Sequence, residues 1–399
     1  MFDAVVAGHL CLDIIPTFPP SPVPVEAGAL LVPGRLVEVG EAVLSTGGAV
    51  SNTGLSLARL GIRVRLVARL GADEIGAMTR RIIAGRGPGL ADGLTTAPGE
   101  ESSYTIVISP PGVDRIFLHC PGTNDTFGPE DVTDGLLREA RLFHFGYPPL
   151  MRRMYGAGGA ELAELLARAQ SLGATTSLDL SLPDRAAPSG RADWRAILAR
   201  ALPHVDVFLP SAEELLFMLD RPAYEERLKR SADGDLVRSL TAEEIARLAE
   251  EALDLGARAV GLKLGDRGLY LRTAAEASIS GRGAPAAPRC WRGRELWAPC
   301  FRVAVVGTVG SGDATIAGFL AGLLRGQNPE ECLTSAVAVG ACNVEAADAT
   351  SGVRSWEETG RRIAAGWERR DAAIASAGWT WSQGPGLWRG PADAAHPDG

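Results

Sequence analysis

The chain has 399 residues, of which 46% are hydrophobic and 22% are charged, and its net charge is −8. This composition is typical of a globular protein with a sizeable core, and the length suits one large α/β domain or two smaller ones. The sequence has no Lys/Arg block for nucleic-acid phosphates, no apolar run of the roughly 18 residues that span a bilayer, and no basic leader at its start. We therefore expect a cytoplasmic protein that uses neither nucleic acid nor membrane as a partner.

The first part of the chain combines an α/β pattern with short β segments. An apolar run at 4–7 predicts a central strand that ends at Gly8. Residues 14–40 contain many prolines, so the β-type runs at 30–32 and 36–39 are expected at a sheet edge or in a peripheral flap. Further predicted elements are a helix at 51–60, a strand at 64–67 and a hairpin formed by 104–108 and 115–119.

Helix and strand patterns alternate in the second part of the chain. The predicted helices are 161–172, 194–201, 213–219 and 241–255, and the predicted strands are 174–178, 205–209, 259–263 and 269–272. This alternation indicates a parallel sheet with helices on both faces and ligands at the carboxyl ends of the strands. Residues 224–239 and 275–299 look inserted, and the tryptophans of the aperiodic tail from Ser376 are expected to dock on the body.

The clearest chemical signal is a glycine-spaced turn. Residues 302–306 predict a strand, residues 307–313 read Gly-Thr-Val-Gly-Ser-Gly-Asp, and a helix is predicted to begin at Asp313. The amides of Gly310, Ser311, Gly312 and Asp313 would then form an anion hole at a helix N-terminus. An ionised Asp313 at this place can accept the proton of an attacking hydroxyl group, whereas the simpler alternative is a helix cap.

The order of the motifs resembles the ribokinase-like (PfkB) carbohydrate kinase family. Residues 307–313 resemble its C-terminal signature, with Gly307 in place of an Asp and Ser311 in place of an Ala. Gly47-Gly48 and Asn52 resemble its N-terminal signature, and Asp13 follows Gly8 as in its first strand. Residues 71–76 and 121–124 resemble two further family turns, so the resemblance extends from about residue 3 to residue 365.

The resemblance implies a role for each matching residue. Asp313 is the expected catalytic base, and Gly310, Ser311 and Gly312 are expected to hold the transferring phosphoryl group. The substrate-binding residues are expected to be Asp13, Gly47, Gly48 and Asn52, and the nucleotide-binding residues Lys263, Gly265 and Gly268. Glu214 is expected to orient magnesium-bound water, with Ser211 in place of the family's Asn.

The resemblance also implies the fold and the ligands. The expected fold is a ribokinase-like three-layer α/β/α sandwich with a mostly parallel central sheet and a small β-rich lid. The expected body comprises 1–12, 46–98 and 126–375, the lid 13–45 and 99–125, and an irregular tail 376–399. ATP and Mg²⁺ are the implied cofactors, and Gly307 leaves a monovalent-cation requirement open. A free edge of the lid hairpin would allow a homodimer.

The expected activity is ATP-dependent phosphorylation of a hydroxyl group on a sugar or sugar-like substrate. Two alternatives stay open. One is a nucleoside kinase on the same scaffold. The other is a catalytically idle regulator that binds sugar or nucleotide, which the departures at Gly307 and Ser211 would suit.

Overall fold

The structure is a computed structural model, and it describes residues 1–18, 32–110, 116–231, 235–276, 279–370, 374 and 376–395. Within this part of the chain, the body is built on an eleven-stranded sheet with the order β14-β15-β13-β12-β11-β10-β9-β8-β1-β4-β5. The strands from β5 to β11 in this order run parallel, and those from β12 to β14 are antiparallel to their neighbours. The strands are β1 (Phe2–Gly8), β4 (Val64–Gly71), β5 (Leu94–Ala97), β8 (Ala140–Gly146), β9 (Thr175–Leu178), β10 (Val207–Phe208), β11 (Ala259–Lys263), β12 (Leu269–Thr273), β13 (Glu295–Ala298), β14 (Thr380–Ser382) and β15 (Leu387–Arg389).

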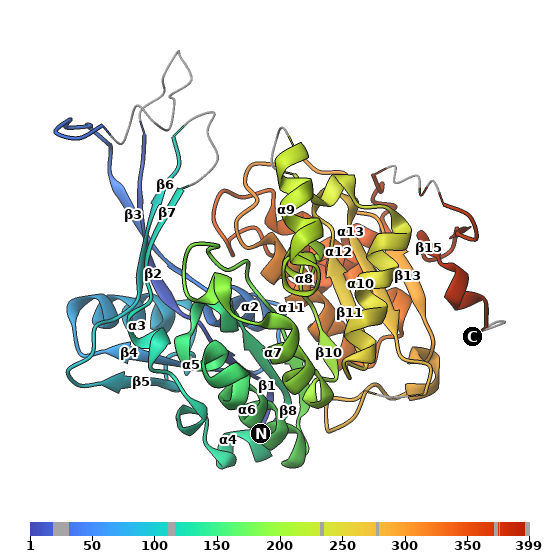
Figure 1. Ribbon diagram of the computed structural model, residues 1–399, viewed down its shortest axis with the longest axis horizontal. Helices are drawn as coiled ribbons and strands as arrows, with labels where there is room; N and C mark the ends of the chain where they lie inside the picture. Colours follow the sequence, from blue (N-terminus) through green and yellow to red (C-terminus); the bar gives the residue numbers. More distant parts are fainter. Residues whose placement is uncertain are drawn as a thin grey trace.

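Helices cover both faces of this sheet. Because side chains alternate along a strand, Ala4 and Val6 of β1 belong to one buried cluster, while Val5 and Ala7 belong to the other. The first cluster includes residues of α2 (Ala49–Arg59), α3 (Glu74–Arg86), α11 (Ser311–Leu324) and α12 (Pro329–Asn343), with α13 (Trp356–Ala364) packed against it. The second includes residues of α4 (Asp134–Glu139), α5 (Arg152–Tyr155), α6 (Ala160–Ser171), α7 (Trp194–Ala201), α8 (Ala212–Leu219), α9 (Arg221–Arg230) and α10 (Ala242–Asp254). The expected three-layer α/β/α body is therefore confirmed (Figure 1).

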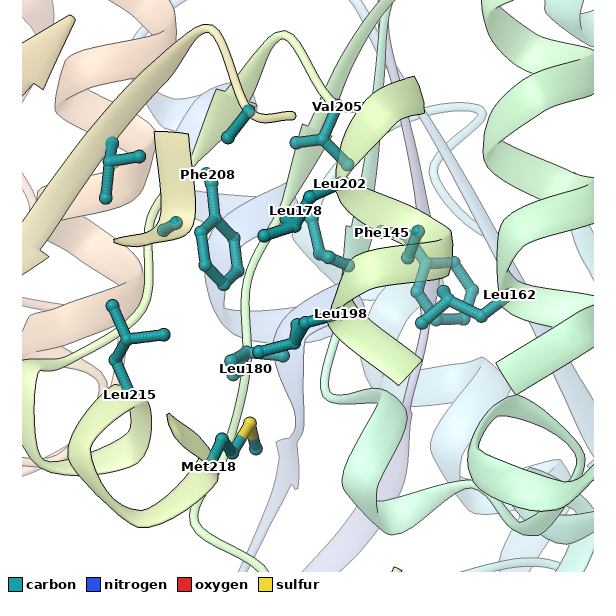
Figure 2. Packing of buried hydrophobic residues seen from close by; sticks show 14 of the residues in the cluster. Phe145, Leu162, Leu178, Leu180, Leu198, Leu202, Val205, Phe208, Leu215 and Met218 are labelled. Atoms are coloured by element: carbon teal, nitrogen blue, oxygen red, sulfur yellow. The ribbon is translucent and has the colours of Figure 1, made fainter. Parts of the chain in front are cut away.

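The second cluster shows how the layers hold together. In Figure 2, Phe145, Leu178 and Phe208 project from β8, β9 and β10 toward side chains of the covering helices, among them Leu162 and Leu198. All five side chains have 0% of their surface exposed. Burying an aliphatic or aromatic side chain of this size stabilises a fold by about 1.5–3 kcal/mol, so this contact fixes the strands whose ends carry the site.

A separate four-stranded sheet forms the lid, with the order β3-β2-β6-β7. Its strands are β2 (Cys11–Pro16), β3 (Ala42–Gly47), β6 (Tyr104–Ile108) and β7 (Ile116–Cys120). Figure 1 shows that this sheet stands out from the body. Val43, Leu44 and Phe117 on its strands are 51%, 42% and 56% exposed. These apolar side chains agree with the predicted homodimer through the lid, which stays a prediction.

Several predicted elements are wrong. Residues 36–39 form no strand, and the second lid strand is β3, which pairs with β2. Residues 30 and 31 of the other proline-flanked run lie outside the described residues. Residues 302–306 also form no strand, because their backbone partners lie in loops and not in a strand: the amides of Arg302 and Val306 donate to Glu368 O and Val344 O, each at 2.8 Å. The following helix begins at Ser311 and not at Asp313.

The two apparent insertions and the tail are parts of the body. Most of the first insertion is helical in α9 and the turn at Val237–Ser239, and the second supplies β13. The tail is not irregular, since β14 and β15 extend the central sheet. Trp379 docks on the body as expected, with its ring centroid 6.2 Å from that of Tyr270 and 5.9 Å from that of Trp297. No helix in the described ranges has the length and apolar character needed to cross a membrane.

A buried ion pair attaches the tail to β13. Arg294 Nε lies 2.5 Å from Asp393 Oδ1, and the two side chains are 7% and 1% exposed. Arg294 also contacts Glu330 at the start of α12. Because neither partner can return to water while the fold is intact, the loss of one charge leaves the other buried with less compensation.

We expect Asp393→Ala to lower the free energy of unfolding by about 2 kcal/mol. The loss is smaller than for an isolated buried ion pair, because Glu330 still compensates the charge of Arg294. Urea unfolding followed by tryptophan fluorescence measures this loss. The control is Glu226→Ala, because the Arg230–Glu226 pair is 77% and 62% exposed and should contribute little. Equal effects of the two substitutions would contradict the prediction.

Candidate active site

Polar residues follow the carboxyl ends of five neighbouring parallel strands. They are His9 after β1, Tyr147 after β8, Asp179 after β9, Ser211 after β10, and Lys263 at the end of β11. Because these strands run parallel, their carboxyl ends lie along one edge of the sheet. The lid joins the body at this edge, since β2 begins shortly after β1 ends.

Asp313 lies at the centre of this edge, and its carboxylate is held by three side chains. Asn52 Nδ2 donates to Oδ2 at 3.1 Å, Thr53 Oγ1 donates to Oδ1 at 3.1 Å, and the Tyr147 hydroxyl lies 2.9 Å from both oxygens. Asp313 is 3% exposed, and its burial raises the pKa of the carboxyl group, whereas Lys263 and the three donors lower it. Gly310 is the N-cap of α11, so the alternative that Asp313 merely caps the helix is wrong.

The glycine turn before Asp313 requires its glycine at position 310. Gly310 has φ 67, and a Cβ atom there would lie 2.6 Å from Ala349 O. Asn343 Nδ2 donates to Val309 O at 2.8 Å and fixes the turn. The first-turn amides of α11 have no acceptor within the helix, and the Ser311 amide donates to Thr308 O at 3.3 Å. Gly312 and Asp313 are thus the amides best placed to meet an anion.

Lys263 lies directly beside this helix N-terminus. Its Nζ is 2.6 Å from Asp179 Oδ1, and a Cβ atom on Gly312 would lie 3.8 Å from Nζ. Burial lowers the pKa of Lys263, but Asp179, Glu214 and Asp313 raise it, and the net direction is upward. The ammonium group is therefore charged and stands next to the amides that the sequence predicts as an anion hole.

The charges near Lys263 suit a divalent cation together with phosphate. Asp179, Glu214 and Asp313 all act on Lys263, so acidic groups outnumber the basic one around it. A polyphosphate would be repelled by these carboxylates unless a cation neutralised them. Burial raises the pKa of Asp179, whose Oδ2 atom is buried without a hydrogen-bond partner. Such hard oxygen ligands are those that Mg²⁺ prefers.

Glu214 has a structural task as well as its predicted one. Its Oε2 accepts from the Ser211 amide at 2.6 Å, and its own amide donates to Ser211 Oγ at 3.1 Å. Ser211 thus caps α8 in place of the family's Asn. In the part of the chain that the structure describes, no three His, Cys, Asp or Glu side chains could hold a metal ion by themselves. A magnesium ion here would therefore also need water or phosphate oxygens, as predicted for Glu214.

The predicted nucleotide loop is a tight turn between β11 and β12. Gly265 and Gly268 have φ 58 and 103, and a Cβ atom on Gly268 would lie 2.0 Å from Ala298 O. Arg267 Nη1 donates to the carbonyl oxygens of Val237 and Leu240 at 2.8 and 2.7 Å. The segments that look inserted in the sequence, at 224–239 and 275–299, therefore supply the contacts that hold this loop.

The predicted substrate residues meet where the lid joins the body. A Cβ atom on Gly47 would lie 2.4 Å from Asp13 Oδ2, and one on Gly48 would lie 2.5 Å from His9 Nδ1. Gly48 is therefore required, since its φ is 90 and a Cβ atom would also lie 2.4 Å from His9 O, whereas at Gly47 the Asp13 side chain would have to move. Burial raises the pKa of Asp13 to about 6, although hydrogen bonds from Cys11 and Thr105 oppose the rise.

Two sets of polar contacts join the lid to the body: one between two histidines, and one between an asparagine side chain and the backbone. His9 Nε2 lies 3.3 Å from His119 Nε2 of β7. Asn124, which follows β7, binds both the amide and the carbonyl group of Leu10 at 3.1 Å. The Asn of the turn at 121–124 thus has a structural role, because its side chain satisfies the backbone amide and carbonyl groups of Leu10, which lies between β1 and β2.

Gly307 departs from the family signature and packs closely. A Cβ atom there would lie 3.0 Å from Ala346 O and from Ala347 Cα. A longer side chain would require this backbone segment to move. The requirement for a monovalent cation stays an open prediction.

The family model for the pfkB family carbohydrate kinase matches residues 5–356 of the chain. The chain belongs to the pfkB family of carbohydrate kinases. This pfkB carbohydrate kinase is 24% identical over 278 residues to an uncharacterized sugar kinase of Archaeoglobus fulgidus, covering 70% of this chain and 90% of that protein. It is 27% identical over 178 residues to the probable fructokinase-4 of Arabidopsis thaliana, covering 44% and 53% of the two chains.

Solved structures have the same fold as this pfkB kinase. A fructokinase with bound ATP from Xylella fastidiosa has a TM-score of 0.67 at 21% identity, with 92% and 99% of the two chains covered. An Arabidopsis thaliana ribokinase complexed with ribose and ATP has a TM-score of 0.64 at 18% identity, with 90% and 98% covered. An adenosine kinase from Sinorhizobium meliloti reaches 0.63 at 18%, with 91% and 99% covered. The predicted family and the ribokinase-like fold are confirmed.

Three residues of the site were not predicted from the sequence. Thr53 and Tyr147 bind the Asp313 carboxylate, and Asp179 pairs with Lys263. Asp179 and Tyr147 each lie close behind an apolar strand, which is the signal that could have identified them. Thr53 gives no signal of its own beyond its place next to Asn52.

We expect Asp13→Asn to stabilise the protein at neutral and alkaline pH. Because burial raises the pKa of Asp13 from 3.8 to about 6, the ionised carboxylate costs stability in the fold, and this cost appears as the pH rises from about 4 to 6. A pKa change of this size corresponds to roughly 3 kcal/mol. Urea unfolding at several pH values should show nearly equal stabilities at pH 4 and a more stable variant at pH 8.

Asp254→Asn is the control, since this exposed aspartate lies at the end of α10, remote in the sequence from the predicted site. It should keep the pH dependence of the wild-type protein. A stability difference between Asp13→Asn and wild type that is the same at pH 4 and pH 8 would show that the burial of Asp13 has no energetic cost.

Proposed function

We propose that this carbohydrate kinase transfers the γ-phosphoryl group of ATP to a hydroxyl group of a sugar or sugar-like substrate. The observation that carries the proposal is the Asp313 carboxylate, which is buried in the first turn of α11 and held by Asn52, Thr53 and Tyr147. A buried carboxylate fixed at a helix N-terminus combines a proton acceptor with an adjacent anion site.

The proposed reaction assigns each group one task. Asp313 takes the proton of the acceptor hydroxyl, and the acceptor oxygen attacks the γ-phosphorus as the bond to ADP breaks. The Gly312 and Asp313 amides and the Lys263 ammonium offset the negative charge on the transferring group. The short distance between Lys263 Nζ and the position of a Gly312 Cβ atom, 3.8 Å, supports this division of tasks.

The proposed donor is ATP with magnesium. The fructokinase and ribokinase with this fold contain ATP, and a putative ribokinase II from E. coli is in complex with ATP and Mg²⁺. In this chain Asp179 and Glu214 would hold the ion, partly through water, and Gly265 and Gly268 would let the backbone approach the nucleotide. When bound, magnesium neutralises phosphate charge and thereby eases the attack of the acceptor.

The proposed acceptor site consists of Asp13, Gly47, Gly48 and Asn52. The side chains that bind Asp13 are the uncharged Cys11 and Thr105, which suits the hydroxyl groups of a sugar. The likeness to an adenosine kinase keeps the nucleoside alternative, but the curated relatives named above are a sugar kinase and a fructokinase. The observations that motivated the idle-regulator alternative have local structural explanations: Ser211 caps α8, and Gly307 packs closely against the backbone of Ala346 and Ala347. This alternative therefore has less support.

Asp313→Asn is expected to lower kcat by about a hundredfold to ten-thousandfold, the usual contribution of a general base, while the melting temperature stays close to that of wild type or rises. The assay measures ADP release with a panel of hexoses, pentoses and nucleosides. The control is Asp348→Asn, whose carboxylate accepts from the amides of Thr350 and Ser351 and makes no described contact with Asp313. Near wild-type turnover of Asp313→Asn would refute the assignment of the base.

Removal of divalent cations with EDTA is expected to abolish turnover, and added Mg²⁺ should restore it, because the site holds more carboxylates than cations. Glu214→Gln should raise the Mg²⁺ concentration needed for half-maximal rate by about tenfold, since one ionic interaction is lost. Glu213→Gln, on the same turn of α8, is the matched control and should leave that concentration unchanged. Turnover that persists in EDTA would exclude the proposed magnesium role.

A further inference from the structure

Tyr147 has a backbone conformation that a tyrosine rarely adopts. It follows β8 directly and has φ 65 and ψ 44, and Ala157 is the only other non-glycine residue with positive φ among those the structure describes. This left-handed conformation costs a residue with a side chain about 1–2 kcal/mol, whereas glycine would adopt it freely. Pro148 and Pro149 come next and restrict the chain at the same point. A tyrosine at this position therefore indicates that its side chain is needed.

The side chain of Tyr147 ends on the Asp313 carboxylate. Its hydroxyl lies 2.9 Å from each oxygen, and its ring centroid lies 6.1 Å from that of His9, which lies beside Gly48 of the proposed acceptor site. Asn52 and Thr53, which bind the same carboxylate, are 6% and 0% exposed, whereas Tyr147 is only half-buried. Tyr147 is thus the most exposed of the three residues that bind Asp313.

The hydrogen-bonding capacity of Asp313 is nearly used up. A carboxylate has about four lone-pair positions, and Asn52 and Thr53 each use one, on different oxygens. The Tyr147 hydroxyl lies between the two oxygens and shares its proton with the lone pairs that Asn52 and Thr53 leave free. Because the Tyr147 hydroxyl has a single proton, about one lone-pair position stays open beside it, and an acceptor hydroxyl that gives its proton to Asp313 binds there, next to the Tyr147 hydroxyl.

We propose that Tyr147 is a positioning residue for Asp313, which aligns the carboxylate, keeps it ionised, and stands beside the position that the acceptor hydroxyl takes during turnover. This inference rests on the proposed function. The proton of the acceptor passes to Asp313 and not to Tyr147. Tyr147 keeps its own proton, because burial and the neighbouring Asp313 raise the pKa of the phenol well above its usual value.

The test compares wild type, Tyr147→Phe and the control Tyr155→Phe by the pH dependence of kcat/KM. The phenylalanine keeps the ring and removes only the donor to Asp313. The activity that requires ionised Asp313 is lost as the pH falls, and the loss of a donor raises the pKa of Asp313. We therefore expect the acidic limb of Tyr147→Phe to move upward by about one pH unit or more, the equivalent of one hydrogen bond to a charged group.

At pH values below the acidic limbs of both proteins, the kcat/KM of Tyr147→Phe should then be roughly tenfold below that of wild type, and the two should converge on the plateau above those limbs. Tyr155→Phe, which removes a hydroxyl from α5, should follow the wild-type profile. An acidic limb of Tyr147→Phe at the wild-type position, with kcat/KM lowered equally at all pH values, would mean that Tyr147 only packs and would overturn the proposal.

A second measurement separates this inference from the proposed function. If wild type turns over no sugar or nucleoside, the proposed function fails, and the Asp313 carboxyl group can still be titrated by ¹³C NMR, with Asp313→Asn for assignment. A higher pKa of Asp313 in Tyr147→Phe than in wild type would support the positioning contact. Identical titration curves would overturn it whether or not the protein is active.

Discussion

The buried carboxylate of Asp313 is the constraint around which the site is arranged. A charge that is almost fully removed from water is tolerated only when it is hydrogen-bonded and paired. Asn52 and Thr53 of α2, Tyr147 after β8 and Lys263 at the end of β11 satisfy this requirement. The base therefore links three regions of the body, and α11 must keep its place against α2 and the sheet for the site to exist.

The segments that look like insertions and a tail in the sequence support the sheet edge and the loop next to the proposed site. β13, β15 and β14 widen the sheet beyond β12, and the Arg294–Asp393 pair attaches the end of the tail to β13. Arg267 donates to the carbonyl groups of Val237 and Leu240 and accepts from Trp297 Nε1 at its own carbonyl group, so two segments support the loop that contains Gly265 and Gly268. What looks like insertion and tail in the sequence is thus structural support for the edge of the body where the nucleotide is proposed to bind.

Some parts of the site reduce the stability of the fold. Asp13 is buried against Gly47 with its pKa raised to about 6, and Tyr147 adopts a left-handed backbone. Polar groups placed at a cost in stability are typical of sites built for a ligand, because the ligand later supplies the missing partners. Ser211 and Gly307 are different, since each fits its surroundings, and they weaken neither the helix cap nor the glycine turn.

The sequence by itself determined the layered α/β body, the lid hairpin and the place of Asp313, because these depend on local periodicity and on glycines that a turn requires. The amino-terminal motif predicted Asn52 as a substrate residue, which stays a prediction, and gave no sign that its side chain binds Asp313. Only the tertiary structure decided that β13, β14 and β15 join the sheet, since such short strands have no pattern of their own and are defined by distant partners. The same holds for Tyr147, which lies 166 residues from Asp313 along the chain. Nothing local to either residue encodes that contact, because it forms only when parallel strands bring their carboxyl ends to one edge.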